Sequence, residues 1–183
     1  MKIKKLAKLL FLITPCFFIV TPLPTIMAST NMQDIVVGFS PGQTAKEIIL
    51  LAISEAHKSI DIAAYSFTSK SIALALVDAQ NRGINVRVVA DKKSNSSRYT
   101  AVTYLTNHHI TVKLNEKYAI MHNKFIIIDG HSVETGSFNY TQSAVERNAE
   151  NVIYLRNCPK ISEKYMIEFN RLWQESFYIK PTY

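Results

Sequence analysis

The sequence predicts an α/β fold in which a mixed β-sheet is flanked by helices on both faces. Strand-like and helix-like segments alternate through the first two thirds of the chain that follows residue 28, as they do in α/β sandwiches. Further along, the connections shorten, and Asp129-Gly130 stands between two β-rich runs, which is a strong hairpin signal. The sequence has no internal repeat and no low-complexity linker, so we expect a single domain.

Local signals place the elements in order. Ser40-Pro41-Gly42 is a turn between the first strand and the first helix. Residues 59–65 alternate in the manner of a strand, and the helix after them has Ser69 as a candidate N-cap and Gly83 as a candidate C′ residue. The expected strands are 34–39, 59–65, 84–90, 110–114, 124–128, 132–135 and 151–155. The expected helices are 44–57, 70–82, 99–107 and 160–176, with one helical turn after Asn139.

The first 28 residues are predicted to be a secretory signal that is no part of the fold. Four lysines precede an apolar stretch at 9–20, which is too short to span a bilayer comfortably, and Ile26-Met27-Ala28 resembles a cleavage site. An uncleaved anchor is the alternative, disfavoured because three prolines interrupt the apolar run. We expect an exported protein, periplasmic or secreted, whose domain at 29–183 has no stable membrane anchor.

Cleavage after Ala28 would change the charge and the cysteine content. Four of the 21 basic residues and none of the 14 acidic ones lie in the signal, so the remaining chain has a net charge of +3. A mildly basic protein is compatible with a polyanionic substrate but does not identify one. Cys16 would also be lost, which leaves Cys158 alone and excludes an internal disulfide.

One segment concentrates residues suited to anion chemistry. It has the pattern H-x-K-x4-D followed by G-S-x-N. A strand turns residues i and i+2 to the same side, so the first His and the Lys of the pattern should point together. An imidazole beside an ammonium indicates a site for an anion. The residues of the pattern are His122, Lys124, Asp129, Gly136, Ser137 and Asn139.

This pattern resembles that of the phospholipase D superfamily, and most closely its small, single-motif bacterial endonucleases, the Nuc-like branch. Residues 64–76 and 148–151 also fit the resemblance. It implies the α/β sandwich of that superfamily, with one copy of the motif in this chain. It also implies a phosphodiester hydrolase that needs no cofactor.

The chemistry of a phosphodiester explains these residue types. Its negative charge resists a nucleophile, so a site must first neutralise the non-bridging oxygens. Lys124 would supply charge, Ser137 and Asn139 near the start of a helical turn would add neutral donors, and Gly136 would let the backbone approach the phosphate. The resemblance implies that His122 is the nucleophile, which forms a phosphohistidine intermediate.

The leaving oxygen also needs a proton, and in the superfamily a second copy of the motif supplies the histidine that gives it. This chain contains a single H-x-K. We therefore expect a homodimer with a shared active site, in which one His122 attacks and the other protonates. Two copies of Lys124 would then face one phosphate, and no acidic cluster has metal-ligand spacing, so no metal site is expected.

Two carboxylates have different expected roles. Glu150 matches the family position that holds the imidazole by its other nitrogen, and a carboxylate there would orient the ring. Asp129 belongs to the motif and is a second catalytic candidate. It also opens the predicted hairpin, so capping that turn is at least as suitable a role as a chemical one.

The sequence is compatible with more than one phosphodiester substrate. Lys92, Lys93 and Arg98 follow a strand, where α/β folds tend to place ligands, and are candidate nucleic-acid contacts or simply a solvated loop. We expect a nonspecific, metal-independent endonuclease acting on DNA and RNA. The alternative is a phospholipase D that hydrolyses phospholipid head groups, which should show an apolar rim near its site. A non-catalytic phosphate-binding module is a third interpretation.

Overall fold

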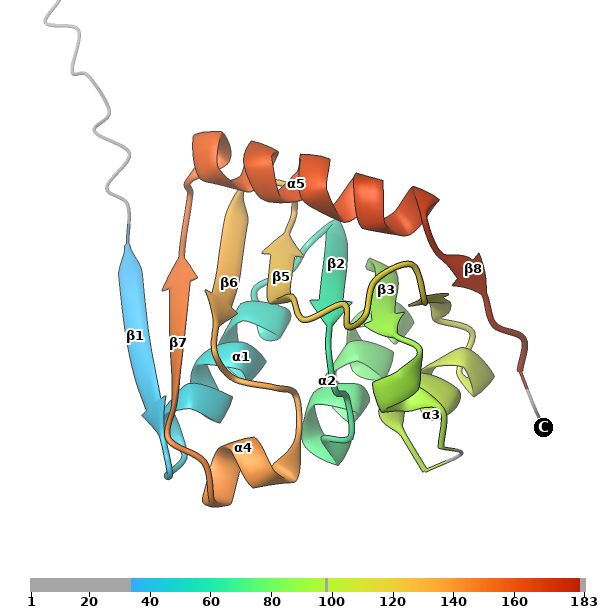
Figure 1. The fold of residues 1–183 in the computed structure, drawn as a ribbon. Coiled ribbons are helices and arrows are strands. Elements are labelled where there is room, and N and C mark those ends of the chain that lie inside the picture. The colour runs from blue at the N-terminus through green and yellow to red at the C-terminus, as the bar shows by residue number, and fades with distance from the viewer. Residues whose placement is uncertain (1–33, 98, 182–183) are drawn as a thin grey trace, which may run out of the picture. The chain divides into compact units, whose positions relative to one another are not determined.

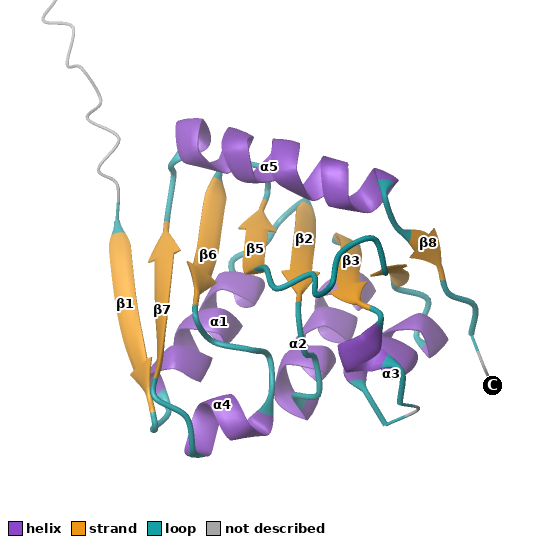
Figure 2. Cartoon of the chain, viewed as in Figure 1, coloured by secondary structure: helices purple, strands orange, loops and turns teal. Residues whose placement is uncertain are grey.

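The computed structural model describes residues 34–97 and 99–181, in which one mixed sheet carries the helices (Figures 1 and 2). The strand order is β1-β7-β6-β5-β2-β3-β4-β8. The strands are β1 (Ile35–Ser40), β2 (Ser59–Ala64), β3 (Asn85–Asp91), β4 (Thr111–Asn115), β5 (Lys124–Ile128), β6 (Ser132–Gly136), β7 (Glu150–Leu155) and β8 (Phe177–Tyr178). The helices are α1 (Thr44–Ser54), α2 (Lys70–Asn81), the 3-10 turn η1 (Lys93–Asn95), α3 (Ala101–Asn107), α4 (Gln142–Glu146) and α5 (Pro159–Gln174).

The pairing directions explain why several strand ends meet. The strands β2, β3 and β4 run parallel, and the remaining neighbours pair antiparallel. Ala64 at the end of β2 therefore lies opposite Lys124 at the start of β5. Glu150 at the start of β7 lies opposite Ser40 at the end of β1. The lower edge of the sheet in Figure 1 thus collects residues that are far apart in sequence.

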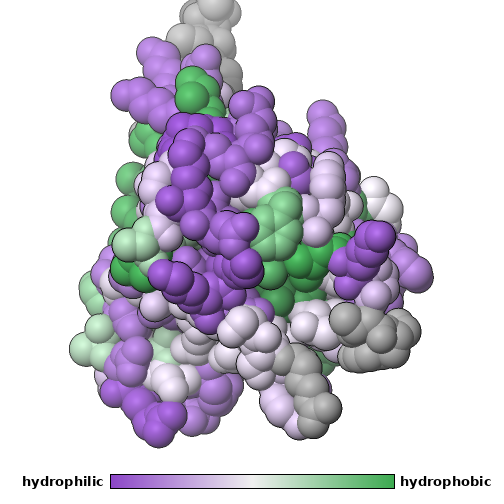
Figure 3. Space-filling view, turned by 45° about the vertical axis from the view of Figure 1, so that its right-hand side comes forward, coloured by the Kyte–Doolittle hydropathy of each residue, from purple (hydrophilic) through white to green (hydrophobic). Residues whose placement is uncertain are grey.

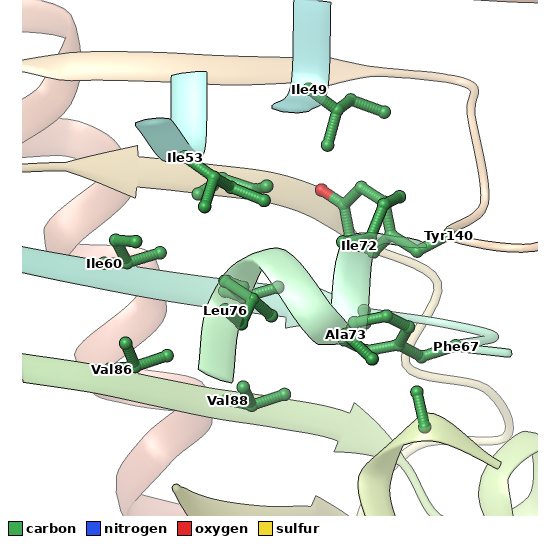
Figure 4. Packing of buried hydrophobic residues seen from close by; sticks show 14 of the residues in the cluster. Ile49, Ile53, Ile60, Phe67, Ile72, Ala73, Leu76, Val86, Val88 and Tyr140 are labelled. Atoms are coloured by element: carbon green, nitrogen blue, oxygen red, sulfur yellow. The ribbon is translucent and has the colours of Figure 1, made fainter. Parts of the chain in front are cut away.

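Helices cover both faces of this sheet, which confirms the predicted fold class. The helices α1, α2 and α3 pack on one face, where apolar side chains from the helices meet those of β2 and β3 (Figure 4). The helix α5 crosses the other face and buries Phe169 and Leu172 against Phe125 and Ile127 of β5. Because β5 is buried on both sides, its near-continuous apolar run anchors the segment that carries the motif.

Glycine and aspartate at the predicted turns have the expected backbone conformations. Gly83 follows α2 with φ of +89°, and Asp129 and Gly130 have φ of +53° and +71°. Positive φ at both central positions matches the twist of the flanking strands. The hairpin is closed by the amide of His131, which donates to the carbonyl of Ile128 at 3.1 Å.

The structure departs from the predicted elements where tertiary contacts intervene. The first helix ends at Ser54 rather than at residue 57, because the amides of His57 and Lys58 donate to the carboxylate of Asp129 instead of continuing the helix. The third helix begins at Ala101 rather than at residue 99. The two-residue strand β8 was not predicted, since it forms only by pairing with β4.

Two expectations fall on residues that the structure does not describe. They are the signal at 1–28, together with its cleavage after Ala28, and the contact role of Arg98. Within the described ranges, every helix is too short or too polar to cross a membrane.

Candidate active site

His122 and Lys124 are held at the sheet edge by the chain on both sides of them. Lys124 is the first residue of β5, and the amide of Met121, just before His122, donates to the buried carboxylate of Asp91 at 2.9 Å. Lys124 is only 8% exposed, whereas His122 is exposed. The imidazole is therefore accessible while its neighbouring ammonium is largely withdrawn from water.

The two side chains are in direct contact, as the strand spacing predicts. The Nζ atom of Lys124 lies 3.0 Å from Nδ1 of His122 and donates to the His122 carbonyl at 2.6 Å. The ring of Tyr65, just after β2, lies against both, with its centroid 4.5 Å from the imidazole centroid and 5.2 Å from Lys124 Nζ. An ammonium over an aromatic face is attracted by the ring electrons.

Electrostatics favour an anion at this position. Burial lowers the pKa of the Lys124 ammonium, although the carboxylate of Glu150 acts in the opposite direction. A poorly hydrated cation gains most when an anion replaces its missing water.

The contact with Lys124 also sets the tautomer of His122. As an ammonium, Lys124 can only donate, so Nδ1 of His122 accepts and the neutral ring carries its proton on Nε2. A nucleophilic Nε2 needs the opposite tautomer, with the proton on Nδ1.

Ser137 and Glu150 meet across β6 and β7. The hydroxyl of Ser137 donates to Oε2 of Glu150 at 2.6 Å and accepts from the amide of Asn151 at 3.0 Å. Oε1 of Glu150 accepts from the side chain of Asn148 at 2.9 Å. Glu150 thus lines the same cavity as His122, but its hydrogen bonds in the described structure go to Ser137 and Asn148. Its predicted role of holding an imidazole stays a prediction.

Gly136 and Asn139 complete the segment after β6. A Cβ atom at Gly136 would lie 2.1 Å from the carbonyl oxygen of Asn151, so this glycine lets β6 and β7 approach, a reason that the sequence did not suggest. Asn139 Oδ1 is buried and has no hydrogen-bond partner among the described residues. The helical turn expected after Asn139 is α4, which begins at Gln142 with Thr141 as its N-cap, so the expected donors Ser137 and Asn139 precede this helix rather than lie in its first turn.

Asp129 follows the far end of β5, so the whole strand, about 17 Å long for its five residues, separates it from the segment that carries His122. Its carboxylate accepts the amides of His57, Lys58 and Ser59 at 2.7 to 3.2 Å. Burial acts to raise its pKa, but these amides outweigh burial and hold the pKa below its ordinary value. In the structure Asp129 therefore caps the hairpin and joins it to the chain before β2, the structural role that the sequence suggested beside a chemical one. Its place among the catalytic candidates stays a prediction.

The predicted nucleic-acid contacts are partly engaged within the chain. Lys92 forms an ion pair with Glu116, and its Nζ lies 5.4 Å from the Phe177 ring centroid. Lys93 Nζ donates to the carbonyl of Ala119 at 3.4 Å, in the segment that leads to His122. Contacts of these two lysines with nucleic acid stay a prediction.

An open cavity of about 700 Å³ joins the motif residues of β5, β6 and β7. One side of the cavity is formed by Lys164, Tyr165 and Glu168 of α5, which the sequence did not single out. Their spacing fits one face of a helix, but nothing in the local sequence says which strand that face packs against. No three His, Cys, Asp or Glu side chains in the described part of the chain are grouped so that they could hold a metal ion. The cavity residues outside the predicted set are Asn123, Phe125, Thr135, Lys164, Tyr165 and Glu168.

Comparison with known sequences identifies the family. Residues 49–173 match the sequence profile of a family described as cardiolipin synthase, PLD-like domain. The chain is 38% identical over 128 residues to a phospholipase D of Rickettsia prowazekii (strain Madrid E), in a match that covers 70% of this chain and 62% of the relative. The chain thus spans about three fifths of that relative's length.

Two solved structures share the fold. Nuc from Salmonella typhimurium, described as a phospholipase D family member, matches with a TM-score of 0.79 and 37% sequence identity, over 81% of this chain and 99% of Nuc. NucT from Helicobacter pylori matches with a TM-score of 0.72 and 26% identity, over 80% of this chain and 100% of NucT. The family profile and these structures agree with the motif: this chain belongs to the phospholipase D superfamily, as a single-motif, Nuc-like member.

Proposed function

We propose that this protein is a phosphodiesterase that hydrolyses DNA and RNA without sequence preference through a covalent intermediate on His122. The observation that carries the proposal is the pair formed by an accessible imidazole and a buried ammonium, 3.0 Å apart, at the wall of an open cavity. Similarity to proteins named Nuc and NucT supports nucleic acid as the substrate.

The proposed reaction has two displacements. Lys124 and Asn139 bind the non-bridging oxygens, joined by Ser137 when its hydroxyl turns from Glu150 to the phosphate, and Nε2 of His122 attacks phosphorus as the P–O bond to the leaving nucleotide breaks. The leaving oxygen takes a proton from a general acid. A water then attacks phosphorus, gives a proton to the same group, and breaks the P–N bond, which releases a phosphomonoester and free His122.

Glu150 has a specific task in this scheme. Lys124 donates to Nδ1 of His122 in the described structure, which favours the tautomer that cannot attack through Nε2. Substrate phosphate would draw the ammonium away, and a carboxylate that accepts a hydrogen bond from Nδ1–H would then hold the ring in the tautomer whose Nε2 lone pair is free to attack. We assign this task to Glu150, in this chain or in its partner. Glu150→Gln, which keeps the shape, should lower kcat by about 100-fold or more with little change in KM.

A second copy of the chain would provide the general acid. The sequence has a single H-x-K, and we propose a homodimer in which each His122 serves one of the two roles. A dimer of one wild-type chain and one His122→Ala chain, purified through two different tags, should then have well under half of the wild-type activity. Half of the wild-type activity in that dimer, or full activity of a monomer at high dilution, would refute the shared site.

A phospholipid substrate is the second candidate, and one observation favours it. Ile120, two residues before His122, is 48% exposed, and Phe39 at the end of β1 is 61% exposed. Phe39 pairs with Asn151, so both side chains lie near the site edge, where acyl chains would need apolar contact. The cavity residues themselves are mostly polar, and hydrophilic side chains cover most of the face in Figure 3, around a smaller hydrophobic area.

The deciding assay offers purified protein plasmid DNA, RNA and phosphatidylcholine vesicles in excess EDTA. We expect cleavage of both nucleic acids, loss of cleavage in His122→Ala, and full cleavage in His131→Ala, a histidine beyond the other end of β5. Cleavage of vesicles alone would establish the lipid alternative. Binding without cleavage of any substrate would favour the non-catalytic module, and activity that EDTA abolishes would contradict metal independence.

We propose export from the sequence of residues 1–28 alone, since the structure does not describe those residues. Expression of the whole chain in a Gram-negative host, followed by fractionation and N-terminal sequencing, should give a periplasmic or secreted protein that begins at Ser29. Protein retained in the membrane with an intact N-terminus would support the anchor instead.

A further inference from the structure

The helix α5 lies directly against the residues on both sides of the motif lysine. The ring of Tyr165 meets that of Phe125 edge to face, with centroids 5.0 Å apart, and Phe125 follows Lys124. The side chain of Asn123, next to His122, donates to Oε1 of Glu168 at 3.2 Å. We call Lys164, Tyr165 and Glu168 the α5 wall, since all three line the cavity.

The two charged residues of the α5 wall differ in whether their charge is already paired within the chain. Both oxygens of Glu168 accept from Arg171, at 2.6 Å and 2.9 Å, so this carboxylate is already neutralised. Lys164 lies one helical turn before Glu168 and is exposed; the ion pairs of the described residues do not include it. The cavity therefore has a buried cation, Lys124, on its sheet side and an exposed cation on its helix side.

Tyr165 adds a surface for a planar group. Its ring is partly exposed and is supported from one side by Phe125. Nucleic-acid bases stack on such supported aromatic side chains without regard to sequence. The cavity volume of about 700 Å³ also falls within the range of about 300–1,000 Å³ for sites that hold ligands larger than one phosphate group.

We propose that Lys164 and Tyr165 form a subsite for the nucleotide next to the scissile phosphodiester, with the ammonium on the neighbouring phosphate and the ring against the base. The subsite rests on the proposed function and makes its substrate more specific. A polynucleotide has a second phosphate beside every diester. A phosphatidylcholine head group instead carries a cation there, which Lys164 repels, so the same wall favours nucleic acid over that lipid.

The test compares Lys164→Gln with Lys160→Gln; Lys160 is an exposed lysine one turn earlier on α5 and is not among the residues that line the cavity. Both are assayed on a short single-stranded oligonucleotide at several salt concentrations, and on bis(p-nitrophenyl) phosphate, a diester with no second phosphate. Lys164→Gln should raise KM for the oligonucleotide about five- to tenfold and reduce the slope of log KM against log salt by about 0.7, the contribution of one phosphate contact. It should leave kcat/KM for the small diester within about twofold.

The aromatic half of the subsite has its own variant. Tyr165→Leu keeps an apolar contact with Phe125 but removes the stacking surface, and should raise KM for the oligonucleotide by about fivefold or more with an unchanged salt slope. Circular dichroism and thermal unfolding verify that the variant is folded. A KM equal to that of the wild-type protein would remove Tyr165 from the subsite.

The outcomes separate this proposal from the proposed function. A wild-type protein that cleaves neither substrate would overturn the function itself. If it cleaves the oligonucleotide, but Lys164→Gln has the same KM and salt slope as Lys160→Gln, the subsite is wrong while the function stands. An equal loss on the oligonucleotide and the small diester would place Lys164 at the scissile phosphate, and would likewise overturn the subsite.

Discussion

Glu134 offers the sharpest test of the energetics of this fold. It lies on β6, is 1% exposed, and its carboxylate accepts the hydroxyl of Tyr140 at 2.9 Å. Burial raises its pKa to about 8, against the opposing effect of that hydrogen bond. Glu134 is therefore mainly protonated at neutral pH in the folded protein. It holds Tyr140, whose carbonyl accepts the amides of Thr68 and Ser69, in the loop that follows Asn139.

The magnitude follows from proton linkage. Above the ordinary pKa of 4.5 the unfolded chain releases the Glu134 proton, whereas the folded protein keeps it up to about pH 8. The free energy of unfolding then falls as pH rises, by about 1.4 kcal/mol per pH unit. From about pH 5.5 to about pH 7.5 this group alone should lower the stability by about 3 kcal/mol. The loss begins near the ordinary pKa and is complete above the raised one.

The assay is urea denaturation of the wild-type protein and Glu134→Gln, followed by circular dichroism across this pH range. Glutamine cannot titrate, so the stability difference between the two proteins should change by about 3 kcal/mol in favour of the variant as pH rises. Any constant penalty for burying the amide cancels in this slope. Glu163→Gln, an exposed residue on α5, should show no such change. Parallel curves for the wild-type protein and Glu134→Gln would refute the reasoning.

Three further variants test other parts of the structure. Asp129→Asn should lower the free energy of unfolding by about 1–3 kcal/mol at neutral pH through weaker bonds to three amides, with kcat within about threefold. Because the folded pKa of Asp129 is lowered, this stability difference should start to shrink as pH falls to the ordinary aspartate pKa and vanish only below the lowered folded pKa; a large loss of kcat would return Asp129 to the chemistry. Gly136→Ala should lower the free energy of unfolding by about 1–3 kcal/mol, since its Cβ would collide with the Asn151 carbonyl; a variant as stable to urea as the wild-type protein would contradict this packing. Lys124→Met should lower activity in the plasmid assay by about 1,000-fold or more. It should leave the free energy of unfolding unchanged or higher, because a desolvated ammonium is removed; marked destabilisation would show that the lysine is mainly structural.

Local rules account for the parts of the site that could be predicted. Strand periodicity placed His122 beside Lys124, and their contact at 3.0 Å agrees with it. Turn chemistry placed the hairpin at Asp129-Gly130, because glycine and aspartate adopt the positive φ of such a turn more readily than most residues. The alternation of elements predicted the α/β class, since each strand and helix must bury one apolar face.

The sequence by itself therefore determined the fold class, the hairpin and the motif pair, all of which depend on neighbours within a few residues. Only the tertiary structure decided that Asp129 lies outside the cavity, that Ser137 bonds Glu150 across β6 and β7, and that α5 supplies one wall of the cavity. The physical reason is that periodicity encodes which face of an element is buried, but not which partner buries it. Here the order β1-β7-β6-β5-β2 brings together residues that no local pattern connects.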